Sequence, residues 1–368
     1  MDPAGAGKAT AAAAAVCVTG AGGFIASWLV ERLLAGGDYA VHGTVRDPSD
    51  PKNKHLRALD GAGERLRLFK ADVLDYASVA STVAGCAGVF HVASPCPAAQ
   101  PTNPEVELLA PAVAGTLNVL RACREAGVRR VVVVSSVGAV FMNPNPPEGP
   151  TMDEHCWSNE EYCRATENWY CLSKTLAERE AWAYAEKAGL DVVTVCPPLV
   201  FGPLLQPTVN TSSLFLIRYL KCDGVNAMDD RVRNMVDVRD VADALVLAYE
   251  SPEAAGRYIC SAHARKVSEM VSVVRSLHPS LNCANKFVQL VGDEKVFSTE
   301  KLQRLGWKFR TLEETLKDSV ESYMFVQLVG DEKVFSSEKL QRLGWKFRML
   351  EGMLKDSAES YMSAGILS

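Results

Sequence analysis

Three glycines in the stretch T-G-A-G-G-F-I-A, residues 19–26, separate two segments of different pattern. The short apolar run at 16–18 is typical of a buried strand, and residues 24–34 repeat apolar side chains with the period of a helix. A tight strand-to-helix turn needs residues that tolerate unusual φ angles, and it presents backbone N–H groups at the start of the helix. This order predicts a dinucleotide-binding α/β fold, with a plain glycine-rich turn as the alternative.

Strand-like and helix-like segments continue to alternate after this turn. Helical stretches such as 106–125 separate apolar or β-branched runs at 40–45, 66–69, 88–92, 131–134 and 192–196. Continuous apolar strands that alternate with helices indicate a parallel sheet covered on both faces. We therefore expect a Rossmann-type doubly wound parallel sheet with a smaller C-terminal substrate lobe.

The pattern loosens after residue 197 into proline-rich loop, helix and short strand. We expect four parts along the chain. They are a disordered Ala-rich tail at 1–13, a nucleotide-binding domain at 14–199 plus 234–260, a substrate-binding lobe at 200–233 plus 261–324, and a C-terminal part at 325–368.

That C-terminal part begins with a repeat, because residues 287–324 recur as 325–362 with five changes. Two abutting copies are too few for a solenoid, which needs about three. A lobe with one slot for this unit docks one copy. We expect the first copy to be the docked one, since it has Glu314 where the second has Gly352, and glycine inside a helix costs about 1 kcal/mol.

Composition excludes several classes of protein. The net charge of −5 over 368 residues, without a basic stripe, gives no support for nucleic-acid binding. Eleven cysteines without any Cys-x2-Cys fit neither a disulfide framework nor a zinc site, so we expect no metal, reduced thiols and a cytoplasmic location. Residues 9–30 carry no charge, but glycines interrupt this run, so we expect no membrane span. The expected oligomeric state is a monomer or a weak homodimer.

The end of the second predicted strand indicates which dinucleotide binds. NAD-binding folds usually place a carboxylate there to hold the ribose hydroxyls. This chain has T-V-R-D-P, so that Arg46, followed by Lys52 and Lys54, offers cations where a 2′-phosphate would lie. The pattern predicts NADP(H). The alternative is an ordinary solvated loop, and the carboxylate of Asp47 is consistent with that alternative.

Candidate catalytic groups lie directly after the apolar run at 131–134 and on the helix that follows it. In N-W-Y-C-L-S-K, residues 168–174, Tyr170 and Lys174 share a helix face, and no other tyrosine in the chain has a lysine four positions later. A nearby ammonium would lower the pKa of a phenol from about 10 toward neutrality, where it can exchange a proton with a carbonyl oxygen. Ser135 and Ser136 end the preceding strand, where ligands of open α/β sheets bind. An ordinary helix-surface stripe is the alternative.

Several motifs taken together resemble plant cinnamoyl-CoA reductase-like proteins of the extended short-chain dehydrogenase/reductase superfamily, which also includes dihydroflavonol reductases. The likeness covers about residues 16–323. It is carried by V-T-G-A-G-G-F-I-A, T-V-R-D-P, F-H-V-A-S-P, V-S-S-V-G-A-V, D-E-H-C-W-S, N-W-Y-C-L-S-K-T-L-A-E and G-R-Y-I-C.

This resemblance implies an NADPH-dependent reductase of a phenylpropanoid-type carbonyl, in lignin biosynthesis, with Ser136, Tyr170 and Lys174 as the catalytic residues. The substrate would be a hydroxycinnamoyl-CoA thioester or a related aldehyde or ketone. The resemblance also implies a set of cofactor-binding residues: Gly20, Ala21, Gly22, Gly23, Phe24, Ile25, Arg46, Lys52, Asp72, Val73, Val92, Ala93, Ser94, Tyr170, Lys174, Pro197 and Val200.

The chain departs from this family at places that bear on the substrate. Leu172-Ser173 replaces the Tyr-Gly of cinnamoyl-CoA reductases, and the continuation is closer to dihydroflavonol or aldehyde reductases. Phe215 and Arg218 stand where the CoA-using members carry a His and a Lys. Arg257 is either a further substrate contact or an ion-pair partner.

A dihydroflavonol or aromatic aldehyde reductase is the first alternative to a CoA-thioester reductase. The second alternative is a nucleotide-sugar epimerase-type isomerase, which shares the loop and the Tyr-x3-Lys pair, or a catalytically impaired NADP-binding protein. His91 is expected to be a packed strand histidine rather than a base.

Overall fold

The structure is a computed structural model that describes residues 13–96, 101–145, 151–220, 228–279, 281, 283–289 and 295–331. The predicted tail at 1–13, except its last residue, and most of the second copy of the repeat lie outside these residues. The chain divides into two compact units, each described below by itself: Met1–Pro198 with Arg239–Ser261 and Lys295–Lys308, and Leu199–Val238 with Ala262–Glu294 and Phe309–Ser368.

The first unit contains a seven-stranded, fully parallel sheet with the order β11-β7-β5-β4-β1-β2-β3. Its strands are β1 (Ala14–Val18), β2 (Tyr39–Val45), β3 (Leu66–Lys70), β4 (Gly88–His91), β5 (Arg130–Val134), β7 (Val192–Cys196) and β11 (Gly256–Ile259). The chain reverses its direction of winding between β1 and β4. This confirms the predicted Rossmann-type sheet and places the ligand-binding switch point at the carboxyl ends of β1 and β4.

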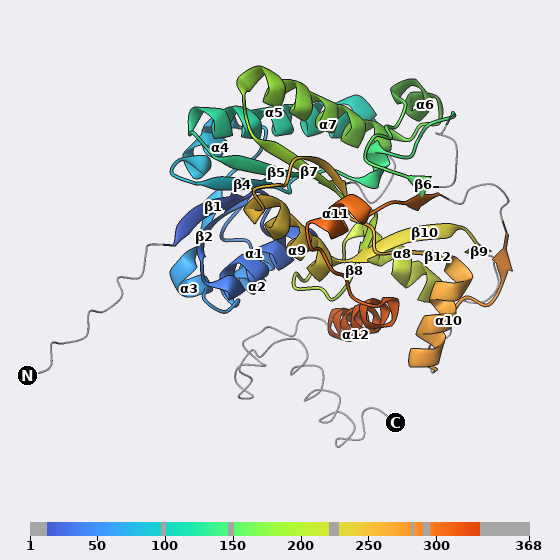
Figure 1. The fold of residues 1–368 in the computed structure, drawn as a ribbon. Helices are drawn as coiled ribbons and strands as arrows, with labels where there is room; N and C mark the ends of the chain where they lie inside the picture. Colours follow the sequence, from blue (N-terminus) through green and yellow to red (C-terminus); the bar gives the residue numbers. More distant parts are fainter. Residues whose placement is uncertain are drawn as a thin grey trace, which may run out of the picture. The chain divides into compact units, whose positions relative to one another are not determined.

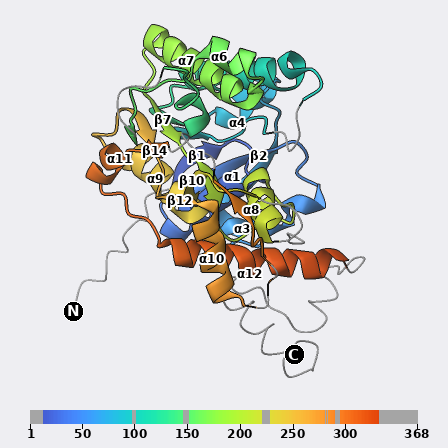
Figure 2. The ribbon, with the colours of Figure 1, turned by 90° about the vertical axis from the view of Figure 1, so that its right-hand side faces the viewer.

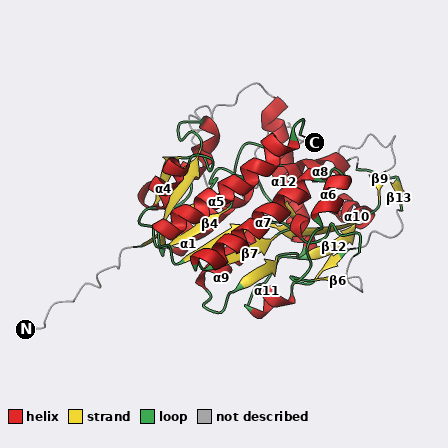
Figure 3. Cartoon of the chain, turned by 90° about the horizontal axis from the view of Figure 1, so that it is seen from above, coloured by secondary structure: helices red, strands yellow, loops and turns green. Residues whose placement is uncertain are grey.

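Helices cover both faces of this sheet (Figure 1). One face carries α4 (Tyr76–Val83), α5 (Ala110–Glu125) and α7 (Trp169–Ala188), and the other carries α1 (Phe24–Gly36) and α9 (Val238–Glu250). Seen from above, α5 and α7 lie side by side across the strands (Figure 3). Continuous burial of both strand faces explains why the strands read as unbroken apolar runs in the sequence.

The core on the α5 side is built from small and β-branched residues. Cys17, Val89 and Val131 of three neighbouring strands pack against Val119 and Cys123 of α5. On the other face, Gly88 is required by the close approach of α9, because a Cβ there would collide with the Tyr249 ring. Each buried side chain of Val or Leu size contributes about 1.5–3 kcal/mol, so this interior is the main force that holds the site-bearing strand ends in place.

By length and composition, the helical stretch Glu105–Glu125 is apolar enough to cross a membrane. It comprises η2 (Glu105–Leu109) and α5. Half of its most apolar part is buried within the first unit, with Val119 and Leu120 fully buried. Such burial is what the core helix of an α/β fold shows.

The first unit also holds a late segment that we expected in the substrate lobe. In it β14 (Val296–Phe297) pairs with β6 (Thr151–Met152), and α11 (Glu300–Arg304) follows. The Trp307 indole donates a hydrogen bond to the Asp240 carbonyl at 2.9 Å. These contacts assign 295–308 to the first unit, which corrects the predicted boundary. Conversely, 234–237 belongs to the second unit, because it forms part of β10.

The second unit is smaller and is built around the sheet β12-β10-β8. Its elements are β8 (Leu199–Phe201), α8 (Thr211–Leu220), β9 (Met228–Asp229), β10 (Val232–Asp237), β12 (His263–Lys266), α10 (Val267–Leu277), β13 (Phe287–Val288) and α12 (Leu312–Asp331). Figure 2 shows α12 as a long helix that packs against α10. The Ser319 and Ser322 hydroxyls of α12 accept hydrogen bonds from the backbone N–H groups of Gly202 and Leu204, which anchors the helix to the loop after β8.

The first copy of the repeat is packed into the fold. In α12 the side chains of Leu316, Val320 and Tyr323 are buried, as expected for a docked copy. The helix then continues to Asp331, past the junction between the copies at 324–325. The same residues F-V therefore form a strand as β13 and a helix at 325–326, so tertiary context rather than local propensity decides their conformation.

Candidate active site

The glycine loop between β1 and α1 has no room for side chains. Gly20 has φ +67°, a left-handed conformation, and a Cβ there would come within 3.1 Å of the Ala93 side chain. A Cβ on Gly22 would lie 2.5 Å from the Asn53 amide oxygen. Thr44 of β2 fixes the loop, because its hydroxyl accepts a hydrogen bond from the Gly20 N–H at 2.9 Å. The backbone itself therefore forms the surface of this turn.

The N-terminus of α1 is suited to an anion. Its cap residue is Gly23, which offers no side-chain oxygen, and the first helical hydrogen bond runs from Ser27 N–H to the Gly23 carbonyl at 2.8 Å. The N–H groups of Phe24, Ile25 and Ala26 precede that bond and have no helical acceptor. N–H groups and the helix dipole together favour a phosphate at this position. The residues present therefore fit a dinucleotide pyrophosphate.

A buried hydrogen-bond chain connects this loop to β4. The Thr19 hydroxyl accepts hydrogen bonds from the N–H groups of Val92 and Ala93, both at 3.0 Å, and bonds the His91 Nδ1 at 3.0 Å. The other ring nitrogen of His91 bonds the Thr116 hydroxyl at 3.1 Å. Burial, and then the Lys174 charge, lower the pKa of His91 to about 3, so the ring is neutral. The prediction that His91 is a packed strand histidine is confirmed. The sequence did not predict that the Thr19 hydroxyl connects this histidine to the backbone after β4.

The predicted 2′-phosphate site lies on the loop after β2. Arg46 follows the last residue of the strand and is exposed. Lys52 is also exposed and forms an ion pair with Asp50 at 2.8 Å. The Asp47 carboxylate accepts hydrogen bonds from the N–H and hydroxyl of Ser49, at 2.9 and 2.7 Å, which lower its pKa. Asp47 is thus engaged by its own turn, and Arg46 and Lys54 present exposed cations in this segment.

The other predicted cofactor residues lie at the carboxyl ends of the strands or just beyond them. Asp72 follows β3, is exposed, and accepts a hydrogen bond from the Leu74 N–H at 2.9 Å. Val73 is half-buried, and a Cβ on Gly115 of α5 would lie 2.8 Å from it. The remaining ones are Val92, Ala93 and Ser94 after β4, Pro197 after β7, and Val200, which lies in β8 of the second unit.

Ser136 and Tyr170 are brought together across a glycine. Ser136 follows β5, and its hydroxyl accepts a hydrogen bond from the Gly138 N–H at 3.0 Å. Tyr170 lies in the first turn of α7, close enough to Ser136 for that hydroxyl to lower its pKa. A Cβ on Gly138 would lie 3.3 Å from the Ser136 hydroxyl and 3.5 Å from the Tyr170 ring. The absence of a side chain at Gly138 is therefore what permits this approach.

The electrostatics of the pair differ from the expectation. Burial raises the pKa of Tyr170, nearby Cys96 and Cys171 raise it further, and the Ser136 hydroxyl lowers it. Lys174 is itself buried, its pKa is lowered by burial, and its ammonium donates to the Val134 carbonyl at 3.3 Å. The prediction that Lys174 draws the Tyr170 pKa toward neutrality is wrong for this arrangement, because desolvation is the largest influence and raises the pKa. The phenol keeps its proton at neutral pH.

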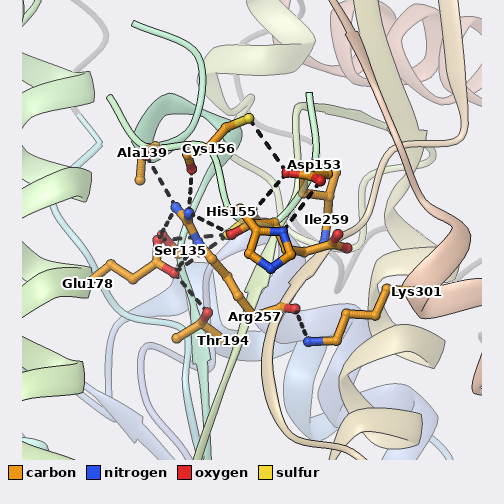
Figure 4. A network of polar contacts seen from close by, with 12 residues as sticks. Ser135, Ala139, Asp153, His155, Cys156, Glu178, Thr194, Arg257, Ile259 and Lys301 are labelled. Carbon is orange, nitrogen blue, oxygen red and sulfur yellow. Dashed lines mark hydrogen bonds and ion pairs between the residues drawn. The ribbon is translucent and has the colours of Figure 1, made fainter. Parts of the chain in front are cut away.

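The face of α7 that carries Tyr170 and Lys174 continues to Glu178, a buried carboxylate that sequence reasoning missed. Glu178 accepts hydrogen bonds from Ser135, at 2.5 Å, and from Thr194, at 2.8 Å. It also forms an ion pair with Arg257 at 2.7 Å (Figure 4). A spacing of four residues from Lys174 was the signal that could have found it.

Arg257 is the ion-pair partner and not a substrate contact. Its side chain is only 6 % exposed. Besides Glu178, its guanidinium donates to the backbone carbonyls of Ala139, Glu154 and Cys156. With these donors used inside the protein, the structure corrects the expectation that Arg257 binds substrate and supports the alternative named for it.

The two departures on the catalytic helix are packing residues. Leu172 is fully buried in a cluster with Leu109, Cys163 and Cys171. The Ser173 hydroxyl donates a hydrogen bond to the Tyr170 carbonyl at 2.8 Å. Neither residue therefore adds a polar group to the candidate site.

The two predicted substrate residues of the second unit lie on α8. Phe215 is half-buried, with its ring edge-on to Tyr219 at 4.8 Å between centroids and under the Arg233 guanidinium at 4.9 Å. Arg218 is exposed. Within this unit, Phe215 is part of an aromatic and cationic cluster, and Arg218 presents a solvent-accessible charge.

Metal chemistry has no visible support in the part of the chain that the structure describes, where no group of three or more His, Cys, Asp or Glu side chains could hold an ion. Ten cysteines in the same residues are free thiols.

A glycine loop at a Rossmann switch point, together with Ser136, Tyr170 and Lys174, defines an extended short-chain dehydrogenase/reductase. Residues 16–260 match the NAD dependent epimerase/dehydratase family. The chain is 47% identical over 311 residues to cinnamoyl-CoA reductase 1 of Petunia hybrida, covering 83% of this chain and 91% of that protein. It is 44% identical over 310 residues to tetraketide alpha-pyrone reductase 1 of Arabidopsis thaliana, covering 83% and 94%.

Among solved structures, yeast methylglyoxal/isovaleraldehyde reductase Gre2, complexed with NADPH, superposes with a TM-score of 0.75 at 28% identity, covering 85% of this chain and 99% of that one. The chain therefore belongs to the NAD dependent epimerase/dehydratase family and, within it, to the cinnamoyl-CoA reductase-like proteins of the extended short-chain superfamily. It is an oxidoreductase of that superfamily.

Proposed function

We propose that this protein is an NADP(H)-dependent reductase of a phenylpropanoid-type carbonyl, with a hydroxycinnamoyl-CoA thioester as the first candidate substrate. The observation that carries the proposal is that the Ser136 hydroxyl and the Tyr170 ring both lie against Gly138, 3.3 and 3.5 Å from the position of a Cβ there. Two hydroxyl-bearing side chains gathered around one glycine can hold a single carbonyl oxygen.

The reaction follows from the state of these groups. The bound nicotinamide supplies the hydride. The Ser136 hydroxyl donates a hydrogen bond to the oxygen as negative charge develops on it, and Tyr170 gives that oxygen its proton. Burial raises the pKa of Tyr170, so the phenol is protonated before the reaction and releases its proton only to a strongly basic alkoxide. Lys174, whose ammonium donates to the Val134 carbonyl, would bind the nicotinamide ribose.

Cofactor recognition divides between two loops. The N–H groups at the start of α1 would hold the pyrophosphate, and Arg46, with Lys52, would hold the 2′-phosphate that distinguishes NADP(H) from NAD(H). The self-contained hydrogen bonds of Asp47 support this assignment, because they turn the carboxylate of the loop toward Ser49.

The substrate class rests on the relatives and on the second unit. A thioester would lose CoA thiol from the tetrahedral product and leave an aldehyde, whereas an aldehyde or ketone would stop at the alcohol. The 47% identical cinnamoyl-CoA reductase supports a thioester, and the exposed Arg218 retains a cation suited to CoA phosphate. Phe215 supplies no hydrogen bond, which keeps a dihydroflavonol or aromatic aldehyde reductase as the second candidate.

The decisive experiment follows NADPH absorbance with feruloyl-CoA, coniferaldehyde and a dihydroflavonol in parallel, for the full chain and for a chain that ends after Asp331. We expect turnover with feruloyl-CoA, and the shortened chain should match the full one. Turnover of the dihydroflavonol alone would favour the second candidate. NAD(H) that stays on the purified protein would indicate an epimerase-type enzyme, and stoichiometric NADPH binding without any turnover would indicate an impaired NADP-binding protein.

We also propose a cytoplasmic location, monomeric or weakly dimeric assembly, and a role in lignin biosynthesis. Reduced thiols at ten cysteines fit a reducing compartment. A fluorescent fusion and sedimentation velocity test the first two, and lignin content in a plant lacking the gene tests the third.

A further inference from the structure

We propose that the buried Glu178–Arg257 ion pair is a positioning device for catalysis, which holds the Ser136 segment against the helix that carries Tyr170 and Lys174. This inference rests on the proposed function and adds two residues to it. Neither residue touches the reacting atoms in this account. They act through the backbone and side chains that they hold.

Glu178 joins four elements of the first unit through one carboxylate. The residue belongs to α7 and is fully buried. Its oxygens accept hydrogen bonds from Ser135 at the end of β5, from Thr194 in β7 and from Arg257 in β11. A carboxylate that accepts this many bonds is held in one rotamer, so α7 cannot slide along the strands without breaking several of them at once.

Arg257 extends the same network to the loop after β5. Its Nη2 donates to the Ala139 carbonyl at 3.1 Å as well as to Glu178 at 3.1 Å. Its Nη1 donates to the Cys156 carbonyl at 2.6 Å and the Glu154 carbonyl at 3.3 Å. The guanidinium also stacks on Trp157, 3.7 Å from the ring centroid. Figure 4 shows the guanidinium between Glu178 and the loop carbonyls.

These contacts flank Ser136 on both sides. The residue before it, Ser135, is held by Glu178, and Ala139 after it is held by Arg257. On the helix, Glu178 shares a face with Lys174 and Tyr170 at intervals of four residues. The pair therefore connects the two parts of the site, Ser136 and Tyr170, that meet at Gly138.

The choice of residues also favours a positioning role. A buried ion pair adds little net stability, because the desolvation of two charges offsets their attraction, and apolar residues of the same volume often stabilise as well. Only a planar guanidinium can donate to a carboxylate and to three carbonyls while it stacks on an indole, so lysine cannot substitute for it. Unlike apolar residues, the Glu178–Arg257 pair fixes the geometry of the backbone and side chains that it contacts.

The test measures Arg257→Lys, Glu178→Gln and Ser135→Ala with feruloyl-CoA and with coniferaldehyde. The readouts are kcat, KM, the Kd of NADPH and the Tm. We expect kcat to fall about tenfold to a hundredfold for the first two variants and less for Ser135→Ala, with both substrates alike, because displacement of reacting groups by about 1 Å costs this much. KM and the Kd of NADPH should change less than about threefold.

Arg179→Gln is the matched control. Arg179 lies over the same Trp157 ring at 5.3 Å, but it is exposed and pairs with Glu160 on the surface. We expect its kcat to equal that of the wild type. Where Glu178→Gln does not fold, Arg257→Lys and Ser135→Ala decide the outcome.

Two results would overturn the inference. A lower Tm with unchanged kcat per folded molecule would make the pair merely structural. A higher KM for feruloyl-CoA alone, with unchanged coniferaldehyde kinetics, would make Arg257 a CoA contact. Absence of wild-type turnover with every carbonyl would instead refute the proposed function, so the two failures are distinguishable.

Discussion

Tyr170 at the start of α7 and Ser136 after the end of β5 both lie against Gly138, and the absence of a side chain at Gly138 lets them approach each other. Substitution of Gly138 should therefore damage catalysis more than folding.

Gly138→Ala would place a methyl group 3.3 Å from both the Ser136 hydroxyl and the Cys171 sulfur. We expect kcat with the best substrate to fall about tenfold, because the two hydroxyls must separate by a few tenths of an ångström. Gly63→Ala is the control, since no atom lies within 4 Å of its Cβ position. Steady-state kinetics and the Tm of both variants check this, and an unchanged kcat for Gly138→Ala would show that the close approach is not needed.

Arg46→Ala should alter the choice between cofactors. Loss of a cation that contacts the 2′-phosphate should lower kcat/KM with NADPH about tenfold to a hundredfold and leave kcat/KM with NADH within about twofold. Arg67→Ala, which removes an exposed arginine from β3, should change neither value. Equal losses with NADPH and NADH would contradict the NADP(H) assignment.

The buried, neutral His91 should lower the free energy of unfolding in acid. Burial lowers its pKa to about 3 in the folded protein, against 6.5 for the free side chain, so the unfolded chain binds a proton that the folded chain does not. This contribution is present above pH 6.5 and is lost as the pH falls from there toward 3. Between pH 7.5 and pH 5, it amounts to about 2 kcal/mol.

Urea unfolding at pH 7.5 and at pH 5 measures this contribution of His91 to the free energy of unfolding. The decrease in the free energy of unfolding should be about 2 kcal/mol smaller for His91→Asn than for the wild type. His155→Asn, at a side chain that is 95% exposed, should behave as the wild type does. The same pH dependence in all three proteins would show that His91 is not responsible.

The two copies of the repeat differ at positions whose role in α12 is visible. Thr315 and Val320 of the first copy are both fully buried. The second copy has Met353 and Ala358 at the equivalent positions. We expect Thr315→Met and Val320→Ala in the first copy each to cost about 1–3 kcal/mol, by overpacking and by cavity formation. Thr299→Ser, another difference between the copies, should be neutral because Thr299 makes no side-chain cap to α11. Thermal unfolding checks all three, and full stability of the first two would mean that either copy fits the slot.

The sequence predicted the sheet, the glycine loop and the shared helix face of Tyr170 and Lys174, because each depends on local pattern: apolar runs, glycine spacing and a helical interval of four. The choice of Ser136 over Ser135 came from the family resemblance. The sequence did not predict the Glu178–Arg257 ion pair. The spacing of four residues from Lys174 marks Glu178 as a residue of the same helix face, but it gives no sign of a partner 79 residues away. The shift of the Tyr170 pKa was predicted with the wrong sign. Proximity of a lysine can be read from spacing, but desolvation depends on what surrounds the phenol.

Proton transfer from Tyr170 to the oxygen of a bound carbonyl is the step on which the proposed mechanism depends. Steady-state kinetics at saturating NADPH compare the kcat of Tyr170→Phe with that of the wild type, and a binding titration gives the Kd of NADPH for both. We expect kcat to fall about a hundredfold to ten-thousandfold while NADPH still binds. Turnover of Tyr170→Phe at the rate of the wild type would contradict this mechanism.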